Sequence, residues 1–500
     1  MTKRTSALPL VLPPRPAGTG AARWLYTALQ RQILSGALRP GARLPATRDL
    51  ARQYRLSRGT IVTAFEQLRA EGYLEGRTGS GTFVARQLPA PHHRAALAPR
   101  RREPRPPPRR LSTYGRRVAP FPHQGVRPMR AFRANQPALD LFPTTLWAQV
   151  AGRRLRRASA QDLEGDPPLG YYPLREAVAD YLVASRGVRC TAEQVAIVSG
   201  VQQALDLVAR LVLDPGDKVV MENPGYIGAA LVFGALGARI ATARVDAQGL
   251  DLRPADRDAR LAYVTPAHQF PLGMSMSLPR RLELLAFART HGLLVFEDDY
   301  DSEYRYAGRP IPALQGLDED GVVCFAGSFS KVLFPSLRLG YLVVPPDLIE
   351  RIAAAESVTN RHPPTLEQAV LCDFMVEGHF ARHIRRMREI YAERLGVLLE
   401  SARSRLDGLL EVSDVEAGLQ TTGWLGRGIG ETAAVRAALA RRVEVSPLGE
   451  YTLGKSERPG LQLGFAAVDV QEIRRGVKDL ALALEPLARP GQGRAKLESR

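Results

Sequence analysis

The chain has 500 residues, 45% hydrophobic and 24% charged, so its composition predicts a globular protein of two or three domains and excludes collagen-like or fully disordered chains. Its three cysteines are too few for a disulfide framework or a four-cysteine zinc site, and no metal site is expected. So few cysteines are typical of a reducing cytoplasm, where we expect the protein to reside. No apolar run approaches the roughly 18 residues that span a bilayer, so no membrane association is expected.

The formal net charge of +18 is confined to the first quarter of the chain. Residues 1–125 contain 23 Lys and Arg residues against 5 Asp and Glu residues, whereas residues 126–500 contain 46 of each sign. This asymmetry predicts a polyanion-binding N-terminal module attached to an electrically neutral body. A basic tail that only aids solubility is the alternative that charge alone leaves open.

Residues 20–86 are predicted to form a small helical domain. Three helices are predicted, over residues 22–35, 47–54 and 58–71, and a two-stranded ribbon over residues 72–85. The first helix has apolar residues at helical spacing, which predicts one buried face: Leu25, Leu29, Ile33 and Leu34.

The third helix has the features of a helix that enters a DNA groove. Ser57 is placed to cap this helix, as Thr47 is placed to cap the second. Arg58 and Thr60 then lie in its first turn, where base and phosphate contacts are made. The opposite, core-facing side is predicted to carry Ile61, Phe65 and Leu68.

The stretch from Leu44 to Val84, with its LPATR helix start and its EGYL and GSGTFV ribbon, resembles the winged helix-turn-helix of the GntR family of bacterial regulators. The resemblance implies binding to double-stranded operator DNA, and it disfavours a winged helix that makes only protein contacts. It implies that the DNA-contacting residues are Arg43, Arg48, Ser57, Arg58, Thr60, Arg77, Ser80 and Thr82.

Residues 87–125 are predicted to be a linker. This stretch is rich in proline and holds nine arginines against one glutamate, so it cannot bury a core. Proline and charge repulsion favour an extended, semi-rigid spacer whose arginines also reach phosphates, and a simple disordered tether is the alternative.

Residues 126–488 are predicted to form a large α/β domain, followed by a C-terminal tail at 489–500. Apolar strand-like runs alternate with amphipathic helical segments, which predicts a mostly parallel sheet covered by helices. The predicted strands are residues 195–198, 218–221, 261–264, 293–296 and 322–326.

Two segments of this domain point to charged groups at strand ends. SGVQQALDL (199–207) leads from a strand into a helix, whose N-terminus offers a seat for a phosphate or is simply capped. In VFEDDYDSEYRY (295–306), Asp298 and Tyr300 project from the same face, as groups that would protonate a pyridine nitrogen and donate to a phenolate oxygen. The neighbouring acids are predicted to point outward into solvent: Asp299, Asp301 and Glu303.

The segment GSFSKVLFPSLRLGYLV (327–343) places Lys331 in an apolar-flanked turn after a strand. Enclosure should lower the pKa of this lysine, as a Schiff-base nucleophile requires. Ser328 and Arg338 could complete the phosphate seat.

Two further turns offer ring and polar contacts. ENPGYIG (222–228) presents Tyr226 for stacking, and TPAHQFPLG (265–273) presents His268 and Gln269. Taken singly, a core tyrosine and a turn histidine explain them as well.

Together these segments resemble fold-type I pyridoxal 5′-phosphate (PLP) enzymes of the aspartate aminotransferase group. Joined to a GntR-type winged helix, the chain resembles the MocR-type transcriptional regulators. The resemblance implies PLP as cofactor, a smaller C-terminal α+β subdomain and a head-to-tail homodimer. It implies a Schiff base at Lys331, with these cofactor-binding residues around it: Ser199, Gly200, Val201, Gln202, Gln203, Tyr226, His268, Gln269, Asp298, Tyr300, Ser328, Ser330 and Arg338.

The chain departs from the family pattern where aminotransferases hold a substrate carboxylate. Gln462 stands in place of the usual arginine, and Gly228 in place of an arginine found in amino-acid-sensing relatives. Both changes weaken a bidentate carboxylate clamp. Arg458, in the preceding loop, could substitute. Leu272 replaces a small hydroxyl residue.

We therefore expect a dimeric transcription regulator whose PLP domain is a sensor rather than an enzyme, with residual half-transamination possible. The signal is either PLP itself, which the missing arginines favour, or an amine or amino acid that displaces Lys331. The alternatives are an active aminotransferase with an appended DNA-binding module, and a repressor whose large domain is only a dimerisation scaffold.

Overall fold

The computed structural model describes residues 10–77, 81–88, 109–122, 128–308, 312–454 and 458–488. The chain divides into two compact units, residues 1–109 and 110–500. The predicted C-terminal tail, most of the predicted linker and Ser80 in the ribbon lie outside the described residues. Within the described ranges, no helix is long and apolar enough to cross a membrane, and no cluster of side chains is suited to holding a metal ion.

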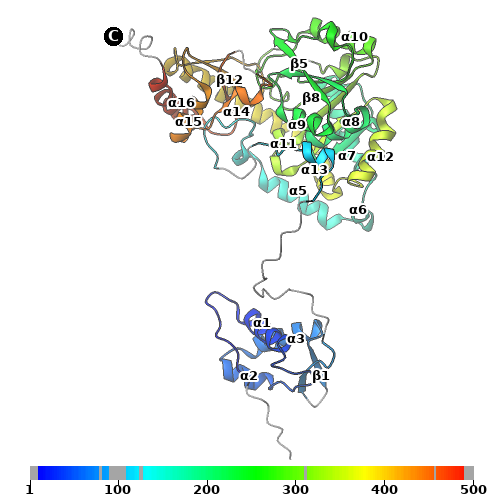
Figure 1. Cartoon of the computed structure of the whole chain (residues 1–500), viewed down its shortest axis with the longest axis vertical. Helices are drawn as coiled ribbons and strands as arrows, with labels where there is room; N and C mark the ends of the chain where they lie inside the picture. Colours follow the sequence, from blue (N-terminus) through cyan, green and yellow to red (C-terminus); the bar gives the residue numbers. More distant parts are fainter. Residues whose placement is uncertain are drawn as a thin grey trace, which may run out of the picture. The chain divides into compact units, whose positions relative to one another are not determined.

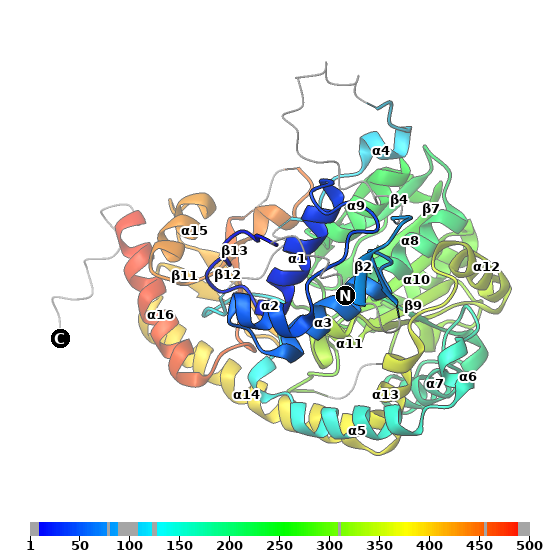
Figure 2. The same cartoon turned by 90° about the horizontal axis from the view of Figure 1, so that it is seen from below.

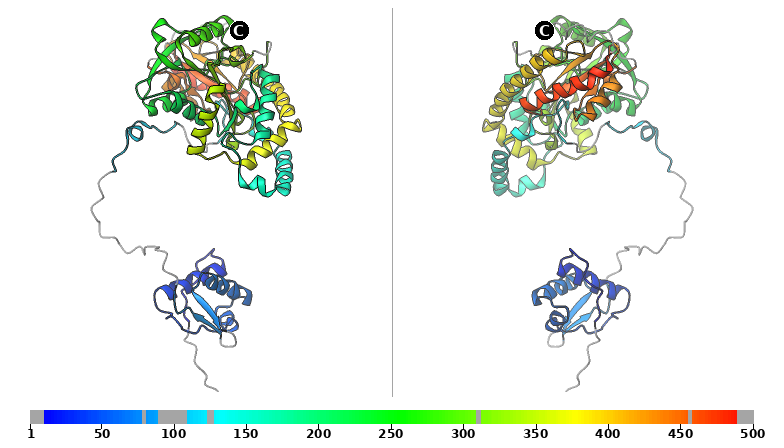
Figure 3. Two further views of the ribbon diagram at one scale, coloured as in Figure 1. Left: turned by 90° about the vertical axis from the view of Figure 1, so that its right-hand side faces the viewer. Right: turned by 90° about the vertical axis from the view of Figure 1, so that its left-hand side faces the viewer.

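The small unit has the predicted order of elements (Figure 3). Three helices are followed by an antiparallel hairpin: α1 (Ala21–Leu34), α2 (Thr47–Tyr54), α3 (Arg58–Ala70), β1 (Leu74–Arg77) and β2 (Gly81–Val84). The predicted core positions are confirmed except one, because Leu34 is 49% exposed at the end of α1. The buried ones pack together: Leu25, Leu29, Ile33, Ile61, Phe65 and Leu68.

One of the two predicted helix caps is confirmed. The Ser57 hydroxyl accepts the Thr60 N–H at 3.1 Å and so caps α3. The prediction for Thr47 is wrong, because Ala46 occupies the cap position of α2 without a side-chain bond and Thr47 is the first helical residue.

An eight-stranded sheet forms the centre of the large unit (Figure 1). Its strands β9, β8, β7, β4 and β5 run parallel, whereas β10 is antiparallel to both its neighbours and β6 is antiparallel to β5. The predicted mostly parallel sheet is confirmed. Across the sheet the order is β3 (Val195–Val198), β10 (Gly340–Val343), β9 (Val323–Ser328), β8 (Leu294–Asp299), β7 (Ala259–Val264), β4 (Lys218–Asn223), β5 (Arg239–Asp246) and β6 (Gly249–Leu250).

Helices cover both faces of this sheet, which explains why its strands are apolar on both sides. Ala196 and Val198 pack with α8 (Val201–Val212) and α9 (Ile227–Leu236). On the opposite face, Val195 and Ile197 pack with α7 (Tyr172–Arg186), and further strand residues pack with α10 (Leu278–His291).

A second, antiparallel sheet forms the C-terminal subdomain that the resemblance implied. Helices α14 and α16 pack side by side along this subdomain (Figure 2). Its elements are α14 (His379–Arg405), α15 (Glu431–Ala440), α16 (Val470–Leu484), and strands in the order β11 (Leu410–Val412), β12 (Gln420–Leu425), β14 (Gly460–Gly464) and β13 (Ser446–Pro447).

Six further α-helices lie in the described part of the large unit: α4 (Thr113–Arg117), α5 (Thr144–Arg157), α6 (Ala160–Glu164), α11 (Phe329–Val332), α12 (Ile349–Thr359) and α13 (Thr365–Val376). Helix α4 lies within the predicted linker, which was expected to be an extended, semi-rigid spacer over residues 87–125. Ser112 caps α4 by accepting the Gly115 N–H, and Arg117 donates to the Leu236 carbonyl at the end of α9. A cap and a contact with another helix's last turn therefore order this part of the linker.

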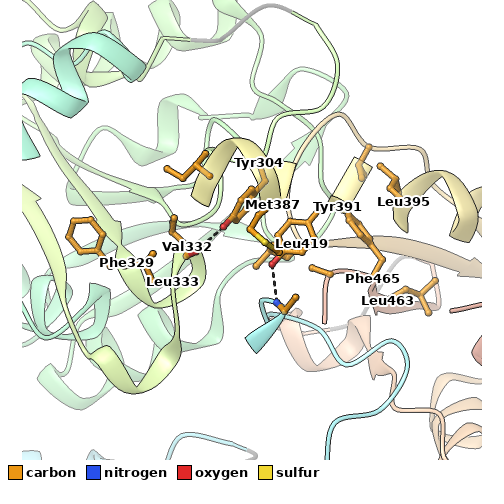
Figure 4. Packing of buried hydrophobic residues seen from close by; sticks show 14 of the residues in the cluster. Tyr304, Phe329, Val332, Leu333, Met387, Tyr391, Leu395, Leu419, Leu463 and Phe465 are labelled. Atoms are coloured by element: carbon orange, nitrogen blue, oxygen red, sulfur yellow. Dashed lines mark hydrogen bonds between the residues drawn. The ribbon is translucent and has the colours of Figure 1, made fainter. Parts of the chain in front are cut away.

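Two buried tyrosines join the segments that surround the large sheet (Figure 4). The Tyr304 hydroxyl donates to the Val332 carbonyl at 2.9 Å, and the Tyr391 hydroxyl accepts the Ala138 N–H at 2.9 Å. Their rings meet edge to face with centroids 4.9 Å apart. The backbone of Val332, the residue next to Lys331, is thus fixed by a hydrogen bond from the buried core.

Replacing the α3 cap tests the local stability of the small unit. Ser57→Ala should destabilise α3 by about 1 kcal/mol, because the Thr60 amide loses its acceptor. Hydrogen–deuterium exchange of the intact chain should show faster exchange in the first turn of α3. Thr63→Ala, on an exposed position of the same helix, should leave it unchanged; equal exchange in both variants would contradict the capping role.

Candidate functional site

The carboxyl ends of several strands meet at one edge of the large sheet, and a cavity of about 1150 Å³ lies there. Ligands of open α/β sheets bind at this edge. Strands β4, β7, β8 and β9 end at it, and α8 begins there after β3. Of the residues predicted to bind a cofactor, those that line the cavity are Gly200, Val201, Gln202, Tyr226, Asp298, Tyr300, Ser328, Ser330, Lys331 and Arg338.

The other four predicted residues do not line the cavity. The Gln203 amide accepts the Ser199 N–H and donates to the Glu356 carboxylate, so it ties the start of α8 to α12. His268 and Gln269 are buried in the turn after β7, where the Gln269 amide donates to neighbouring backbone carbonyls. These residues fix the shape of the wall from behind it.

Lys331 lies in α11 (Phe329–Val332), directly after β9. Its Nζ donates to the Asn135 carbonyl at 2.8 Å. Burial lowers the pKa of Lys331 to about 8, against the opposing charges of Asp301 and Asp298. The direction agrees with the prediction: roughly a tenth of the amine is neutral and nucleophilic at pH 7, whereas less than about a thousandth of an ordinary lysine is.

Asp298 lies near the end of β8 with 5% of its surface exposed. Burial raises the pKa of its carboxyl to about 7, although a hydrogen bond from Tyr263 acts in the opposite direction. The Tyr263 hydroxyl donates to Oδ2 at 2.6 Å, and among the described residues Oδ1 has no hydrogen-bond partner. A buried carboxylate with one unpaired oxygen is suited to a cationic N–H donor.

Tyr300 follows β8 and shares the cavity wall with Asp298, as predicted. Its hydroxyl lies 3.0 Å from Nδ1 of His268, which in turn lies 2.8 Å from the Asp301 carboxylate. Burial raises the pKa of Tyr300 well above its ordinary value, so the phenol keeps its proton. His268 therefore acts as a support for Tyr300 rather than as part of the cavity lining.

The prediction that three acids beside Asp298 point into solvent is wrong. Asp299, Asp301 and Glu303 are all less than a tenth exposed. Asp299 pairs with buried Arg186 of α7 at 2.8 Å, and the Glu303 backbone carbonyl accepts from Arg388 of α14. Helices packed over the strand end convert an apparently solvated stretch into a buried ionic network.

Phosphate-binding groups gather where α8 begins. Gly200, with a φ of 114°, precedes the free N–H groups of the helix. Ser328, Ser330 and Arg338 line the same cavity. In the described part of the chain the buried Ser330 Oγ has no hydrogen-bond partner. The unpaired Ser330 and Asp298 oxygens fit the two ends of PLP, its phosphate and its pyridinium nitrogen.

The positions that depart from the family pattern hold no cation. A Cβ atom at Gly228 would lie 2.5 Å from the Tyr226 ring, so a side chain there would displace the ring. Gln462 is fully buried in β14, and neither of its amide atoms has a hydrogen-bond partner among the described residues. Arg458 does not line the cavity, because it pairs with Glu411 at 2.6 Å and lies over the Trp424 ring.

Sequence reasoning missed most residues that line the site, and it also missed the residues that hold the predicted ones in place. Asn135 holds the Lys331 amine, and its own N–H donates to Gln420 of β12 at 2.7 Å. Tyr263 holds Asp298, and Phe270 packs edge to face against the Tyr226 and Tyr300 rings. Only Tyr263 left a signal, as a tyrosine in an apolar strand. The others depend on contacts between distant segments.

The small unit carries the arginines that were predicted to contact DNA. Arg43, Arg48, Arg58 and Arg77 are all exposed. Within the described residues the first three have no ion-pair partner, whereas Arg77 pairs with Glu75 at 2.8 Å and lies over the Phe83 ring. Ser57 and Thr60 bond each other at the start of α3, and Thr82 accepts from Arg69.

The two units of the chain match two different protein families. Residues 131–480 match the model for class I and II aminotransferases, and residues 21–84 match the gntR family of bacterial regulatory proteins. The chain is 41% identical over 472 residues, 94% of each chain, to the probable rhizopine catabolism regulatory protein MocR of Rhizobium meliloti. It is 29% identical to the pyridoxine biosynthesis regulator PdxR of Corynebacterium glutamicum, over 93% of this chain and 96% of that protein.

Among solved structures, the chain resembles LysN, an α-aminoadipate aminotransferase from Thermus thermophilus complexed with N-(5′-phosphopyridoxyl)-L-leucine. The TM-score is 0.66, with 31% identity over 71% of this chain and 92% of that one. The likeness to Pyrococcus horikoshii kynurenine aminotransferase has the same TM-score at 27% identity, over 71% and 90% of the two chains. A phosphopyridoxyl ligand in the first of these supports PLP as the cofactor of this fold.

The pH dependence of PLP binding tests the state of Lys331. Attack on an aldehyde needs the neutral amine, so the binding rate should rise with pH and level off above about 8, the lowered pKa. Asp298→Asn removes a charge that raises this pKa, and should move the midpoint down. Stopped-flow absorbance measures the rate; a rate that still rises through pH ~10, as for an ordinary lysine, would contradict the assignment.

Proposed function

This chain belongs to the MocR-type transcriptional regulators, and from this premise we propose that its PLP site is a sensor that controls DNA binding. Its large unit belongs to the class I and II aminotransferases, and its small unit to the gntR family of bacterial regulatory proteins. The observation that carries the proposal is the cavity whose wall holds both the partly buried Lys331 amine and the Asp298 carboxylate.

The predicted residues of the cavity would each have a role toward bound PLP, which would supply an aldehyde and an electron-withdrawing ring. Lys331 would provide the amine. Asp298 would hold a proton on the pyridine nitrogen, and Tyr300 would present a protonated phenol to the ring oxygen. Tyr226 would stack on the ring, while the start of α8, together with Ser328, Ser330 and Arg338, would hold the phosphate.

We propose PLP itself as the signal, as the relative PdxR is named for pyridoxine biosynthesis. Gly228 and Gln462 support this choice, because neither position presents a cation to an amino-acid carboxylate. An incoming amine that displaces Lys331 is the second form of the signal, and the name of the rhizopine-catabolism relative is consistent with it.

The signal must bind one arrangement of the protein better than another, because a ligand with equal affinity for both shifts nothing. To move the populations of two arrangements from 1:99 to 99:1, a ligand needs about 5.5 kcal/mol of differential affinity, and partial control needs less. The differential contact available here is at Lys331, whose bond to the Asn135 carbonyl competes with covalent capture of PLP.

We propose that the active species is a homodimer in the cytoplasm. Several large apolar side chains are exposed on α5, α6, α7 and α13, and these helices pack against one another in the large unit. Exposed apolar residues gathered on neighbouring helices mark an interaction surface. They are Leu155, Leu163, Tyr172, Val183 and Val376.

Capture of PLP by Lys331 tests the sensor. After borohydride reduction, mass spectrometry of the wild type should find a pyridoxyl adduct on Lys331 and none on Lys331→Ala. The variant should still bind operator DNA but no longer respond to PLP. Lys478→Ala, on the exposed face of α16, is the matched control. A PLP response retained in Lys331→Ala would point to non-covalent sensing, and sustained transamination by the wild type would favour an enzyme.

Single arginines of the small unit test DNA reading. Arg58→Ala should weaken binding to the selected operator by about 1–3 kcal/mol but affect random DNA far less, because Arg58 lies in the first turn of α3. Neutralising Arg109 and Arg110 should weaken both alike and flatten the salt dependence. Fluorescence anisotropy at several salt concentrations measures both; equal losses of specificity in the two variants would refute the division.

A further inference from the structure

The phenol of Tyr263 lies directly behind the PLP-binding carboxylate, in a place where the sequence pattern predicted only a buried strand residue. Tyr263 is 1% exposed in β7, the strand next to β8. In the parallel register it stands opposite Phe296, so Asp298 lies two residues further along on the same face of the sheet. A phenol is long enough to cross this diagonal, and its hydroxyl reaches Oδ2 of Asp298 at 2.6 Å.

We propose that Tyr263 is a positioning residue for PLP. Tyr263 holds the Asp298 carboxylate ionised, with its free oxygen directed at the pyridine nitrogen. The inference rests on the proposed function and extends it to a residue that does not donate to the cofactor itself. Among the described residues, Oδ1 of Asp298 is the carboxylate oxygen left without a partner, and the Tyr263 bond is what fixes the other.

Two aromatic rings stack on the Tyr263 ring and restrict its movement. The Phe296 ring lies with its centroid 6.1 Å away and its plane at 20°, and the Tyr226 ring lies at 6.3 Å and 30°. Offset stacking at these separations is favourable. Tyr263 therefore supports both the carboxylate that pairs with PLP and the tyrosine that covers its ring.

The hydrogen bond matters because its acceptor is desolvated. Burial raises the pKa of Asp298 to about 7, and Tyr263 is a hydrogen-bond donor that lowers it. Burial also raises the pKa of Tyr263 well above its ordinary value, so Tyr263 stays a donor at any working pH. Five other charged or titratable groups interact electrostatically with Asp298: Asp299, Asp301, Tyr226, Tyr300 and Lys331.

Replacing the hydroxyl while keeping the ring isolates this effect. Tyr263→Phe should weaken PLP binding by about 10-fold or more, since hydrogen bonds to buried charges are the strong ones. It should also raise the pH midpoint of the visible absorbance of bound PLP, because a pyridine nitrogen that holds its proton less firmly withdraws fewer electrons from the ring. Both are measured by absorbance titration of the full chain.

A matched control and a second background separate positioning from packing. Tyr391→Phe removes another buried hydroxyl whose bond is to the Ala138 backbone, and should leave both readouts unchanged. In Asp298→Asn, adding Tyr263→Phe should change PLP affinity by no more than about 2-fold, because the two residues act as one unit.

The outcomes distinguish this inference from the proposed function. A borohydride-trapped adduct on Lys331 in Tyr263→Phe, with weakened affinity and a raised midpoint, supports both. Wild-type affinity and midpoint in Tyr263→Phe, or equal losses with and without Asp298, would overturn the positioning role while the sensor stands. No PLP binding by the wild type would overturn the sensor and the inference with it.

Discussion

Two groups of opposite charge are withdrawn from water at one edge of the large sheet, and this constrains which ligand the cavity can accept. Burial lowers the pKa of Lys331 to about 8 and raises that of Asp298 to about 7. The charged form of each group is therefore less favourable than it is in water. A ligand that brings an aldehyde to the amine and a cationic nitrogen to the carboxylate satisfies both. Tyr304 and Tyr263 hold the flanking backbone and carboxylate in place for it.

The same site gives little support to recognition of an amino-acid carboxylate. Gly228 leaves no room for a side chain beside Tyr226, and Gln462 brings an uncharged, fully buried amide to the strand position where aminotransferases carry arginine. These two positions therefore lack the arginines of the family pattern, and the arginines that line the cavity are Arg130, Arg133 and Arg338. A sensor requires a ligand that binds one arrangement of the protein better than another.

Local patterns predicted the elements that are held by local forces. Helix α3 and its Ser57 cap, the winged hairpin and the apolar strands β3, β7 and β8 all follow from spacing, capping and apolar runs within a few residues. The errors lie where packing from distant segments decides. Asp299 and Glu303 were predicted to be solvated but contact α7 and α14, and Asp301 is held by His268 and the Leu419 N–H. Residues 113–117 were predicted to be linker but contact α9.

The sequence by itself predicted two units and a basic N-terminal DNA-binding module, and through the family resemblance it pointed to Lys331, Asp298 and Tyr300, which line one cavity. Residue type, charge and motif spacing carry that information. Only the tertiary structure decided which residues support these three side chains. Tyr263, Asn135 and Gln420 come from a neighbouring strand, a segment near the start of the large unit and the C-terminal sheet. Strand order and chain crossing bring them together, and no short stretch of sequence records either.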